Sequence, residues 1–468
     1  MEKIANAVAR TTEKAVQRCV NHACGASYAL RERLYVCAKC GETLEIECRL
    51  TPPGDPSELR ARWAAARANP KSPRDASGVW RFLELLPFDE DAPFVTLFEG
   101  NTPLFRAPRS ANYCGLADLR LKHQGYNPTG SFKDTGMASA ITQAVISGAR
   151  TAVCASTGNT AASLAAYAAR ANFLAAILLP RGQVSAAKLA QSLDYGALVL
   201  EIDGNFDDCM RLIQELGDDP AIYVANSINP FRIEGQKTVA FELMEQCSWQ
   251  VPDHVVVPGG NMGNSTALGK GFQELLALGL IRRLPRLSVI QAEGAAPVAR
   301  LFATLTAAQR AGDEELPEKL QAVENPKTLA TAIKIGAPVS WKKALRAVVR
   351  SRGQVIAVTE QEIADAKAII GRDSIGCEPA SATTVAGIKR LVAAGHIQPG
   401  EDVVAVLTGH MLKDPDYISN YHRGTLVPDS ASKEAGAQAA PIRGAFQNSP
   451  ARVAATKSAI LAALKQRQ

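Results

Sequence analysis

The chain has 468 residues, too many for one core, so we expect two or three domains. Its net charge of +6 is small for this length, and no dense basic run interleaved with aromatic residues occurs, so nucleic acid is not an expected partner. No segment approaches the roughly 20 apolar residues of a membrane helix, and Met1–Val20 has no apolar signal region. We therefore expect a cytoplasmic protein with no membrane partner, whose ten cysteines are thiols or metal ligands.

Five of the ten cysteines lie between positions 19 and 48. Cys19 and Cys24, followed by Cys37 and Cys40, have the spacing of a zinc ribbon, in which two knuckles supply four thiolates. A zinc ion held in this way would be structural, because four thiolates leave no open position for a substrate. Free thiols without a metal are the alternative.

The stretch 51–74 is rich in Pro, Arg and Ala and is typical of a linker or an exposed helical excursion. From about 79 to 426, short β-branched runs alternate with Ala-rich segments of helical period, which predicts parallel sheets wrapped by helices. The tail has a linker composition over 428–450, followed by a short amphipathic pattern over 452–468. The expected strands are 151–155, 175–179, 197–202, 254–257, 287–290 and 402–407, and the clearest helices are 160–171 and 360–370.

Lys133 stands between a turn and a helix. Asn127-Pro128-Thr129-Gly130 predicts the turn, and a helical pattern follows from about Asp134. A lysine at a helix N-terminus near cationic or apolar surface has a lowered amine pKa, and only the neutral amine attacks an aldehyde. We therefore predict that Lys133 forms a Schiff base with a cofactor. A surface lysine beside a turn is the alternative.

Two segments have the pattern of an anion-binding loop between a strand and a helix. Ser156-Thr157-Gly158-Asn159-Thr160 offers backbone N–H groups and a helix dipole to a carboxylate or phosphate. An ordinary helix cap by Asn159 or Thr160 explains this segment equally well. Pro258-Gly259-Gly260-Asn261-Met262-Gly263-Asn264 lacks both the Walker ending and the dinucleotide spacing, so it is either a cofactor-phosphate loop or a tight glycine turn.

Leu407-Thr408-Gly409-His410 directly follows an expected strand. Ligands bind at the carboxyl ends of parallel strands, so we expect the Thr408 hydroxyl to face a ligand. A neutral acceptor of this kind would hold a pyridine nitrogen without forcing its protonation. The alternative is a β-branched residue that merely ends a strand.

Together these motifs resemble the fold-type II pyridoxal-phosphate enzymes, and among them the threonine synthases. The resemblance runs from Glu99-Gly100-Asn101-Thr102-Pro103-Leu104 to Lys413-Asp414, about two-thirds of the chain. It is most specific in Asn226–Thr238, Gly259–Asn264 and Leu407–Asp414. Thr135 and Met411 depart from the family pattern at positions that shape the pocket.

The resemblance implies a set of cofactor contacts. Lys133 would hold pyridoxal phosphate and later shuttle protons, Asn159 would bond the 3′ oxygen of the ring, and Thr408 would face the ring nitrogen. The residues that would cradle the cofactor phosphate are Gly260, Asn261, Met262, Gly263 and Asn264.

It also implies contacts with O-phospho-L-homoserine as substrate. The substrate carboxylate would be bound by Ser156, Thr157 and Thr160. The substrate phosphate would be bound by Asn226, Ser227 and Arg232. Arginine suits this task because its planar fork binds phosphate oxygens in pairs. In the alternative reading, Arg232 pairs with Glu234 or another carboxylate and only steadies its loop.

The implied architecture is α/β, with two doubly wound domains, the cofactor in the cleft between them, and a small N-terminal Cys-rich segment similar to a zinc ribbon. We expect the Cys-rich segment over 1–50, a linker or helical excursion over 51–90 and a C-terminal tail over 428–468. The large cofactor-binding domain would comprise 91–135 and 250–427, and the small substrate domain 136–249.

The implied activity is conversion of O-phospho-L-homoserine and water to L-threonine and phosphate, by a lyase that works as a homodimer. A serine/threonine dehydratase or a cysteate synthase of the same fold is the nearest alternative. A non-catalytic scaffold that uses the Cys-rich segment to bind protein is the alternative from another class.

Overall fold

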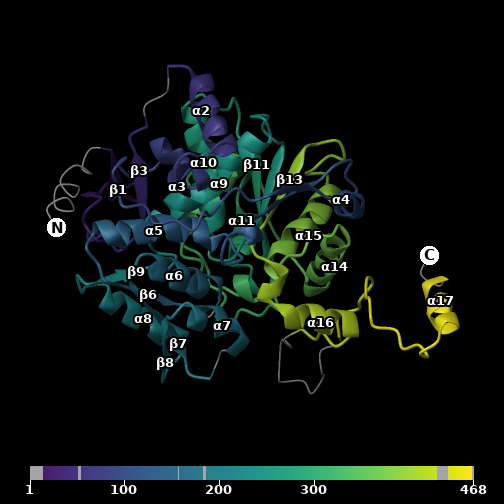
Figure 1. The fold of residues 1–468 in the computed structure, drawn as a ribbon. Coiled ribbons are helices and arrows are strands. Elements are labelled where there is room, and N and C mark those ends of the chain that lie inside the picture. Colours follow the sequence, from purple (N-terminus) through teal and green to yellow (C-terminus); the bar gives the residue numbers. More distant parts are fainter. Residues whose placement is uncertain (1–13, 51–53, 157, 183–185, 429–440, 466–468) are drawn as a thin grey trace.

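The computed structural model describes residues 14–50, 54–156, 158–182, 186–428 and 441–465 (Figure 1). Their strands form three separate sheets of three, six and four strands. Within this described part, every helix is too short or too polar to span a bilayer.

The N-terminal sheet is antiparallel, in the order β2-β1-β3. Its strands are β1 (Ala15–Cys19), β2 (Ser27–Ala29) and β3 (Leu44–Cys48). Ala15, Leu30 and Ile46 pack into the same core as Trp80 and the helices behind it, so this sheet is joined to the body rather than tethered to it.

The six-stranded sheet has the order β12-β11-β10-β13-β5-β4, and only the pairing of β4 is antiparallel. Because side chains alternate along a strand, Val255 and Val257 join the core on one face while Val256 joins the core on the other. Helices cover both faces, as buried parallel strands require. The strands are β4 (Leu104–Arg106), β5 (Arg120–His123), β10 (His254–Pro258), β11 (Arg286–Ala292), β12 (Val355–Val358) and β13 (Val403–Leu407).

The four-stranded sheet is parallel, in the order β8-β7-β6-β9, so β8 and β9 are its edges. It consists of β6 (Thr151–Ala155), β7 (Leu174–Pro180), β8 (Leu198–Ile202) and β9 (Ile222–Val224). Helices α5 and α6 contribute to the core on one face, and α8 contributes to the core on the other.

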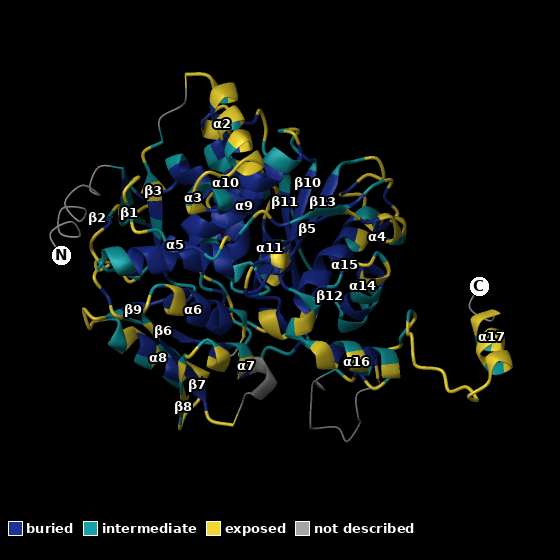
Figure 2. Ribbon diagram, viewed as in Figure 1, coloured by how far each residue is buried: buried dark blue, intermediate teal, exposed yellow. Residues whose placement is uncertain are grey.

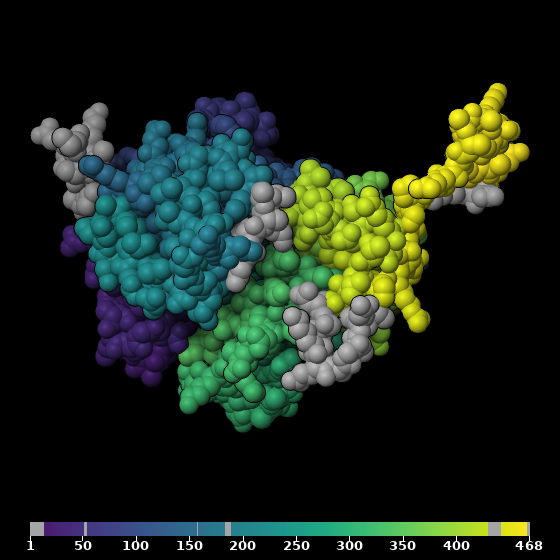
Figure 3. Space-filling view, turned by 90° about the horizontal axis from the view of Figure 1, so that it is seen from below, coloured from purple at the N-terminus to yellow at the C-terminus, as the bar shows by residue number. Residues whose placement is uncertain are grey.

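The helices fill the space around these sheets. Figure 2 shows α5, α9 and α10 as mostly buried, whereas α17 is exposed and stands away from the body in Figures 1 and 3. The α-helices are α2 (Pro56–Ala68), α3 (Pro73–Ala76), α4 (Pro108–Cys114), α5 (Lys133–Ile146), α6 (Asn159–Arg170), α7 (Ala186–Asp194), α8 (Phe206–Leu216), α9 (Phe231–Gln246), α10 (Gly263–Ala277), α11 (Pro297–Thr304), α12 (Ala307–Ala311), α13 (Trp341–Arg350), α14 (Glu360–Arg372), α15 (Pro379–Ala393), α16 (Pro415–Arg423) and α17 (Lys457–Lys465). Short 3-10 turns are η1 (Trp80–Leu85), η2 (Gln124–Tyr126), η3 (Glu293–Ala295), η4 (Thr331–Ile333) and η5 (Met411–Lys413).

All six expected strands and both expected helices are confirmed, with bounds that differ by at most a few residues. The excursion after the Cys-rich segment contains α2, and the side chain of its Trp63 is 1% exposed and stacks near Trp249. It is therefore anchored on the body. Strand β5 and helix α15 were not predicted. The charged residues Arg120 and Lys122 make the sequence of β5 unlike that of a buried strand. The structure pairs Lys122 with the buried Glu242, which neutralises its charge.

Candidate functional site

The site lies where the loops after β5 and β13 meet. The backbone N–H of Phe132 donates to the Thr408 carbonyl at 2.9 Å, and the N–H of His410 donates to the Gly130 carbonyl at 2.9 Å. These bonds join the turn before α5 to the end of β13. Both segments follow the carboxyl ends of neighbouring parallel strands, where α/β proteins bind ligands.

Lys133 is the first residue of α5, and its Nζ lies 4.3 Å from the centre of the Phe132 ring. Burial of its ammonium group lowers the pKa of Lys133 to about 7. The positive charge of Arg232 lowers this pKa further, and the carboxylate of Glu378 partly opposes both effects. A large fraction of this amine is therefore neutral near pH 7, which is the state that attacks an aldehyde.

Asn159 and Thr408 meet on one buried carboxylate, that of Glu378. The Asn159 amide donates to Glu378 Oε2 at 2.9 Å, and the Thr408 hydroxyl donates to Glu378 Oε1 at 3.1 Å. The Oγ atoms of Thr408 and Ser381 lie 3.0 Å apart. Burial raises the pKa of Glu378, which is 3% exposed.

Sequence reasoning missed Glu378. It immediately precedes Pro379 at the start of α15, a place where an acidic residue is ordinary. The available signal was the apolar surroundings in Ile375-Gly376-Cys377-Glu378-Pro379-Ala380, which are unusual for a solvated acid.

The glycine loop after β10 turns sharply into α10. Met262 has a φ of 64° and caps the helix without a side-chain hydrogen bond, so the first N–H groups of α10, from Gly263 onward, are open to an anion. A Cβ at Gly259 would lie 2.6 Å from a Val289 side-chain atom, so this position has no room for a larger residue. Asn261 uses its amide oxygen to accept from the Val339 N–H at 2.7 Å.

Asn264 supplies the test of whether this loop fits a cofactor. Its side chain is 4% exposed, yet neither amide atom has a hydrogen-bond partner among the described residues. Buried amides are normally bonded, so this group fits a polar ligand beside it. An aldehyde cofactor with a phosphate would satisfy Asn264 and the N–H groups of α10, while its aldehyde reacts with Lys133.

The predicted carboxylate-binding segment follows β6. Helix α6 begins after Gly158 without a side-chain cap, so the alternative of an ordinary cap by Asn159 or Thr160 is wrong. Ser156 Oγ accepts from the Gly158 N–H at 3.3 Å, and Thr160 is buried in the first turn. Thr157 lies outside the described residues.

The predicted phosphate-binding segment joins β9 to α9. The Asn226 amide is already bonded on both sides to Ala155, accepting from its N–H at 3.0 Å and donating to its carbonyl at 3.1 Å. It therefore ties the end of β9 to the end of β6. Ser227 is half-buried beside it.

Arg232 is 2% exposed and lies in the first turn of α9. Its Nη1 donates to the Ala225 carbonyl at 3.1 Å, and its Nε has no partner among the described residues. The alternative in which it pairs with Glu234 is wrong, because Glu234 is held by Lys237 at 2.6 Å and by Lys270. Burial lowers the pKa of Arg232 to about 10, so it remains a cation at neutral pH. No carboxylate of the described residues pairs with it.

Two surface cavities, of about 770 and 690 Å³, lie elsewhere. None of the predicted site residues lines either of them. The site is therefore defined by converging polar side chains, and not by these cavities.

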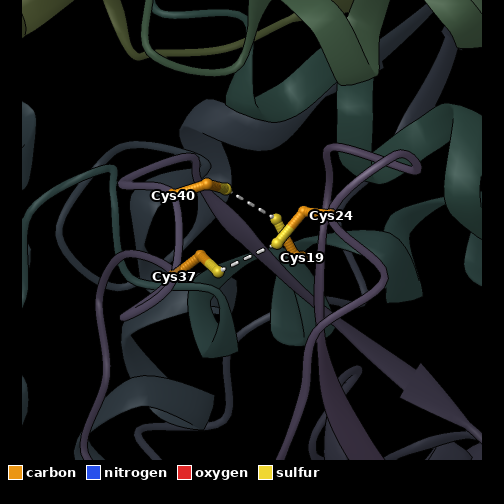
Figure 4. A group of neighbouring side chains, drawn as sticks. All are labelled: Cys19, Cys24, Cys37 and Cys40. Carbon is orange, nitrogen blue, oxygen red and sulfur yellow. Dashed lines mark hydrogen bonds between the residues drawn. The ribbon is translucent and has the colours of Figure 1, made fainter.

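The four predicted metal ligands form a second centre in the N-terminal sheet (Figure 4). The Sγ atoms of Cys19, Cys24, Cys37 and Cys40 all lie within 4.8 Å of one another. The Cys19–Cys40 and Cys24–Cys37 separations are 3.5 and 3.7 Å, close to the edge of about 3.8 Å that zinc–sulfur bonds of about 2.3 Å give to a tetrahedron. The cluster could therefore hold a metal ion.

Comparisons with known proteins agree with this geometry. Residues 95–409 match the family model described as pyridoxal-phosphate dependent enzyme. The threonine synthase of Methanocaldococcus jannaschii is 44% identical over 402 residues, which cover 86% of this chain and 93% of that protein. The threonine synthase of Mycobacterium tuberculosis is 44% identical over 337 residues, which cover 72% of this chain and 88% of that protein.

Solved structures show the same fold at lower identity. The processed form of threonine deaminase isoform 2 from Solanum lycopersicum superposes with a TM-score of 0.56 at 18% identity, over 78% of this chain and 90% of that one. Diaminopropionate ammonia lyase from Escherichia coli gives a TM-score of 0.56 at 16% identity, over 82% of this chain and 94% of that one. The fold-type II architecture is thus confirmed, and the chain belongs to the pyridoxal-phosphate-dependent enzymes and, within them, to the threonine synthases.

Proposed function

We propose that this protein converts O-phospho-L-homoserine and water to L-threonine and phosphate. The observation that carries the proposal is Arg232, a buried cation that has no partner carboxylate in the described part of the chain. Its positive charge lowers the pKa of Lys133. A buried, unpaired guanidinium is costly unless an anion binds it, and a phosphate on the substrate supplies that anion. The relatives named threonine synthase support the same assignment.

When bound, pyridoxal phosphate draws electron density from the substrate and so stabilises negative charge at Cα. Lys133 would hold this cofactor in the resting protein, and its amine, once released, would remove and return protons at the substrate carbons. The lowered pKa suits this work, because the amine accepts and releases a proton near neutral pH. In the net reaction the Cγ–O bond to phosphate and one Cβ–H bond break, while a Cβ–O bond to the water oxygen and a Cγ–H bond form. The remaining proton of water leaves with the phosphate.

We assign the remaining residues according to which of their hydrogen-bonding groups are not already bonded within the protein. Arg232 binds the leaving phosphate, with Ser227 beside it, whereas the fully bonded amide of Asn226 positions this segment against β6. Ser156, Thr157 and Thr160 bind the substrate carboxylate. Asn159, Thr408 and Glu378 hold the cofactor ring, and the loop Gly260, Asn261, Met262, Gly263 and Asn264 holds its phosphate.

The test is phosphate release from O-phospho-L-homoserine and from O-phospho-L-serine, with threonine measured as product. We expect threonine and phosphate in equal amounts from the first substrate. Lys133→Ala should lose the absorption of covalently attached cofactor and essentially all turnover. Turnover of serine or threonine alone would identify a dehydratase, turnover of O-phosphoserine with sulfite a cysteate synthase, and absence of bound cofactor a scaffold.

We also propose that the cluster of Cys19, Cys24, Cys37 and Cys40 binds zinc. The four-thiolate donor set and its dimensions support zinc over harder metals. Metal analysis of protein purified without chelator should find about one zinc per chain.

The division into a Cys-rich segment, a large domain, a small domain and a tail stays a proposal, supported by the three separate sheets. We propose further that the protein acts in the cytoplasm as a homodimer, without nucleic-acid or membrane partners. Light scattering of the purified protein tests the dimer, for which Leu198 and Leu200 on the edge strand β8 offer exposed apolar surface.

A further inference from the structure

The N-terminal Cys-rich segment contacts helix α13, which packs on the six-stranded sheet, and strand β9 of the four-stranded sheet. On the six-stranded side, Lys342 of α13 pairs with Glu42 at 2.6 Å, and Arg346 donates to the Val20 carbonyl at 2.9 Å. On the four-stranded side, Arg33 donates to the Pro220 and Ile222 carbonyls at 2.6 and 3.2 Å. A segment that binds both sides fixes how the β9 region sits relative to the rest of the body.

Tyr35 makes a further contact with strand β9, beside that of Arg33. Its hydroxyl accepts from the backbone N–H of Val224 at 2.8 Å, and its ring packs edge-on against Tyr223 at 6.1 Å between centres. Strand β9 is an edge of its sheet, so its outward backbone groups have no strand to pair with. Arg33 and Tyr35 satisfy two of them, the Ile222 carbonyl and the Val224 N–H.

The residues just after these contacts hold the proposed phosphate site. The Val224 carbonyl accepts from the Asn229 side chain at 2.8 Å, and Asn229 in turn accepts from the Phe231 N–H at 3.0 Å. The Ala225 carbonyl accepts from Arg232. Tyr35 therefore bonds to Val224, the residue directly before Ala225, whose carbonyl orients the Arg232 guanidinium.

The position of Tyr35 depends in turn on the metal cluster. Tyr35 lies two residues before Cys37, in a hairpin whose Val36 bridges Thr43 and whose tip carries Cys40. Cys37 and Cys40 belong to this hairpin, whereas Cys19 ends β1 and Cys24 follows it, so a shared metal would fasten the hairpin to the sheet.

We propose that the Cys-rich segment, held by its metal cluster, positions the residues that bind the substrate phosphate. Through Tyr35 it fixes the end of β9, and thereby the guanidinium of Arg232. The link from Tyr35 to β9 is a statement about the fold alone. The link to the substrate phosphate rests on the proposed function.

Hydrogen exchange of the holoenzyme tests the first link. Tyr35→Phe removes one hydroxyl and leaves the ring, so the amides of 222–226 should exchange about fivefold faster, the factor that corresponds to one hydrogen bond of about 1 kcal/mol. Removing the metal with a chelator should speed exchange of the same amides by at least this factor, and by more than it speeds exchange in β6 and β7. Tyr113→Phe, a half-buried tyrosine on α4, is the matched control and should leave this segment unchanged.

Steady-state kinetics tests the second link. In Tyr35→Phe, kcat/KM for O-phospho-L-homoserine should fall about threefold, within the range that one hydrogen bond sets, because a displaced Arg232 guanidinium stabilises the leaving phosphate less. Cofactor absorption should stay near wild type. Unchanged exchange in β9 after both treatments would overturn the proposal. Faster exchange with unchanged kcat/KM would overturn its link to the substrate. A wild-type protein inactive on this substrate would overturn the proposed function while leaving the exchange result valid.

Discussion

At the scale of single residues, Arg232 acts on Lys133. The charge of Arg232, whose side chain is buried, helps to lower the pKa of the partly buried Lys133. Arg232 keeps its proton because its intrinsic pKa is far higher, so Lys133 is the group that becomes neutral. One residue is thus suited to react and the other to bind an anion.

The pH dependence of cofactor attachment follows from this pKa. The rate at which cofactor-free protein takes up pyridoxal phosphate should fall about tenfold per pH unit below 7 and level off above it, instead of rising to pH 10.5. The stability contributed by Lys133 also rises with pH. Between pH 7 and 10.5 this lysine is protonated in the unfolded chain but not in the folded one, so the free energy of unfolding increases across that window. Stopped-flow absorbance and urea titrations of the cofactor-free protein measure the two effects, and a rate still rising at pH 9 would contradict the assignment.

Arg232→Ala separates binding chemistry from packing. We expect a loss of about 2–4 kcal/mol of transition-state stabilisation, because the cation offsets charge that grows on the leaving phosphate. Arg232 forms no ion pair with any residue that the structure describes, so cofactor absorption and the melting temperature should stay near wild type. Arg232→Lys keeps the charge without the fork and should lose less activity. A variant that melts early and loses its cofactor would instead show that Arg232 steadies the loop.

At the scale of elements, the closeness of these two residues is a result of helix packing. Helix α5 begins at Lys133 and crosses α9, which carries Arg232, at positions where both helices have glycine. A Cβ at Gly235 would lie 1.9 Å from the Thr135 carbonyl oxygen, and one at Gly136 would lie 2.8 Å from the Arg232 carbonyl oxygen. The glycines therefore let the two backbones touch.

Gly235→Ala should push α5 and α9 apart. Alanine improves helix propensity by about 1 kcal/mol, but overpacking against a backbone oxygen costs about 1–3 kcal/mol, so the free energy of unfolding should fall overall. Turnover should fall too, since the helix starts that carry Lys133 and Arg232 are displaced. Gly371→Ala in α14 is the control: its Cβ meets nothing within 4 Å, so urea unfolding should shift towards greater stability. Equal midpoints for the two variants would refute the packing argument.

Patterns within a few residues were readable from the sequence, and contacts between distant segments were not. The strand–helix alternation, the turn before Lys133 and the cysteine spacing are local, and each appears in the structure where it was expected. Glu378 was missed because its partner Asn159 lies 219 residues away. The Tyr35 contact spans 189 residues and involves a backbone N–H, which leaves no mark on the side-chain pattern.

At the scale of the whole molecule, the N-terminal sheet belongs to the folding unit rather than to an appended module. Lys270 of α10 donates to the Ile46 carbonyl and pairs with Glu234, which is fully buried and also held by Lys237. The Cys48 thiol donates to the same carboxylate at 3.5 Å. Ile46 and Cys48 therefore cover this buried ion network and supply two of its hydrogen bonds. Loss of the sheet would remove these bonds and let water reach the network, so it should weaken the body as well.

Removal of the metal should therefore lower the stability of the entire chain. Cys37→Ser takes away one of four ligands in a buried position, and we expect loss of zinc and a single unfolding transition at lower temperature that includes the cofactor site. Cys209→Ser, another buried cysteine but outside the cluster, should keep its zinc and lose only the small free energy of burying a hydroxyl. Calorimetry with metal analysis on both variants shows whether the N-terminal sheet unfolds together with the body or as an independent module. If Cys37→Ser melted in two steps, with the cofactor site unfolding at the wild-type temperature, the N-terminal sheet would be an independent module.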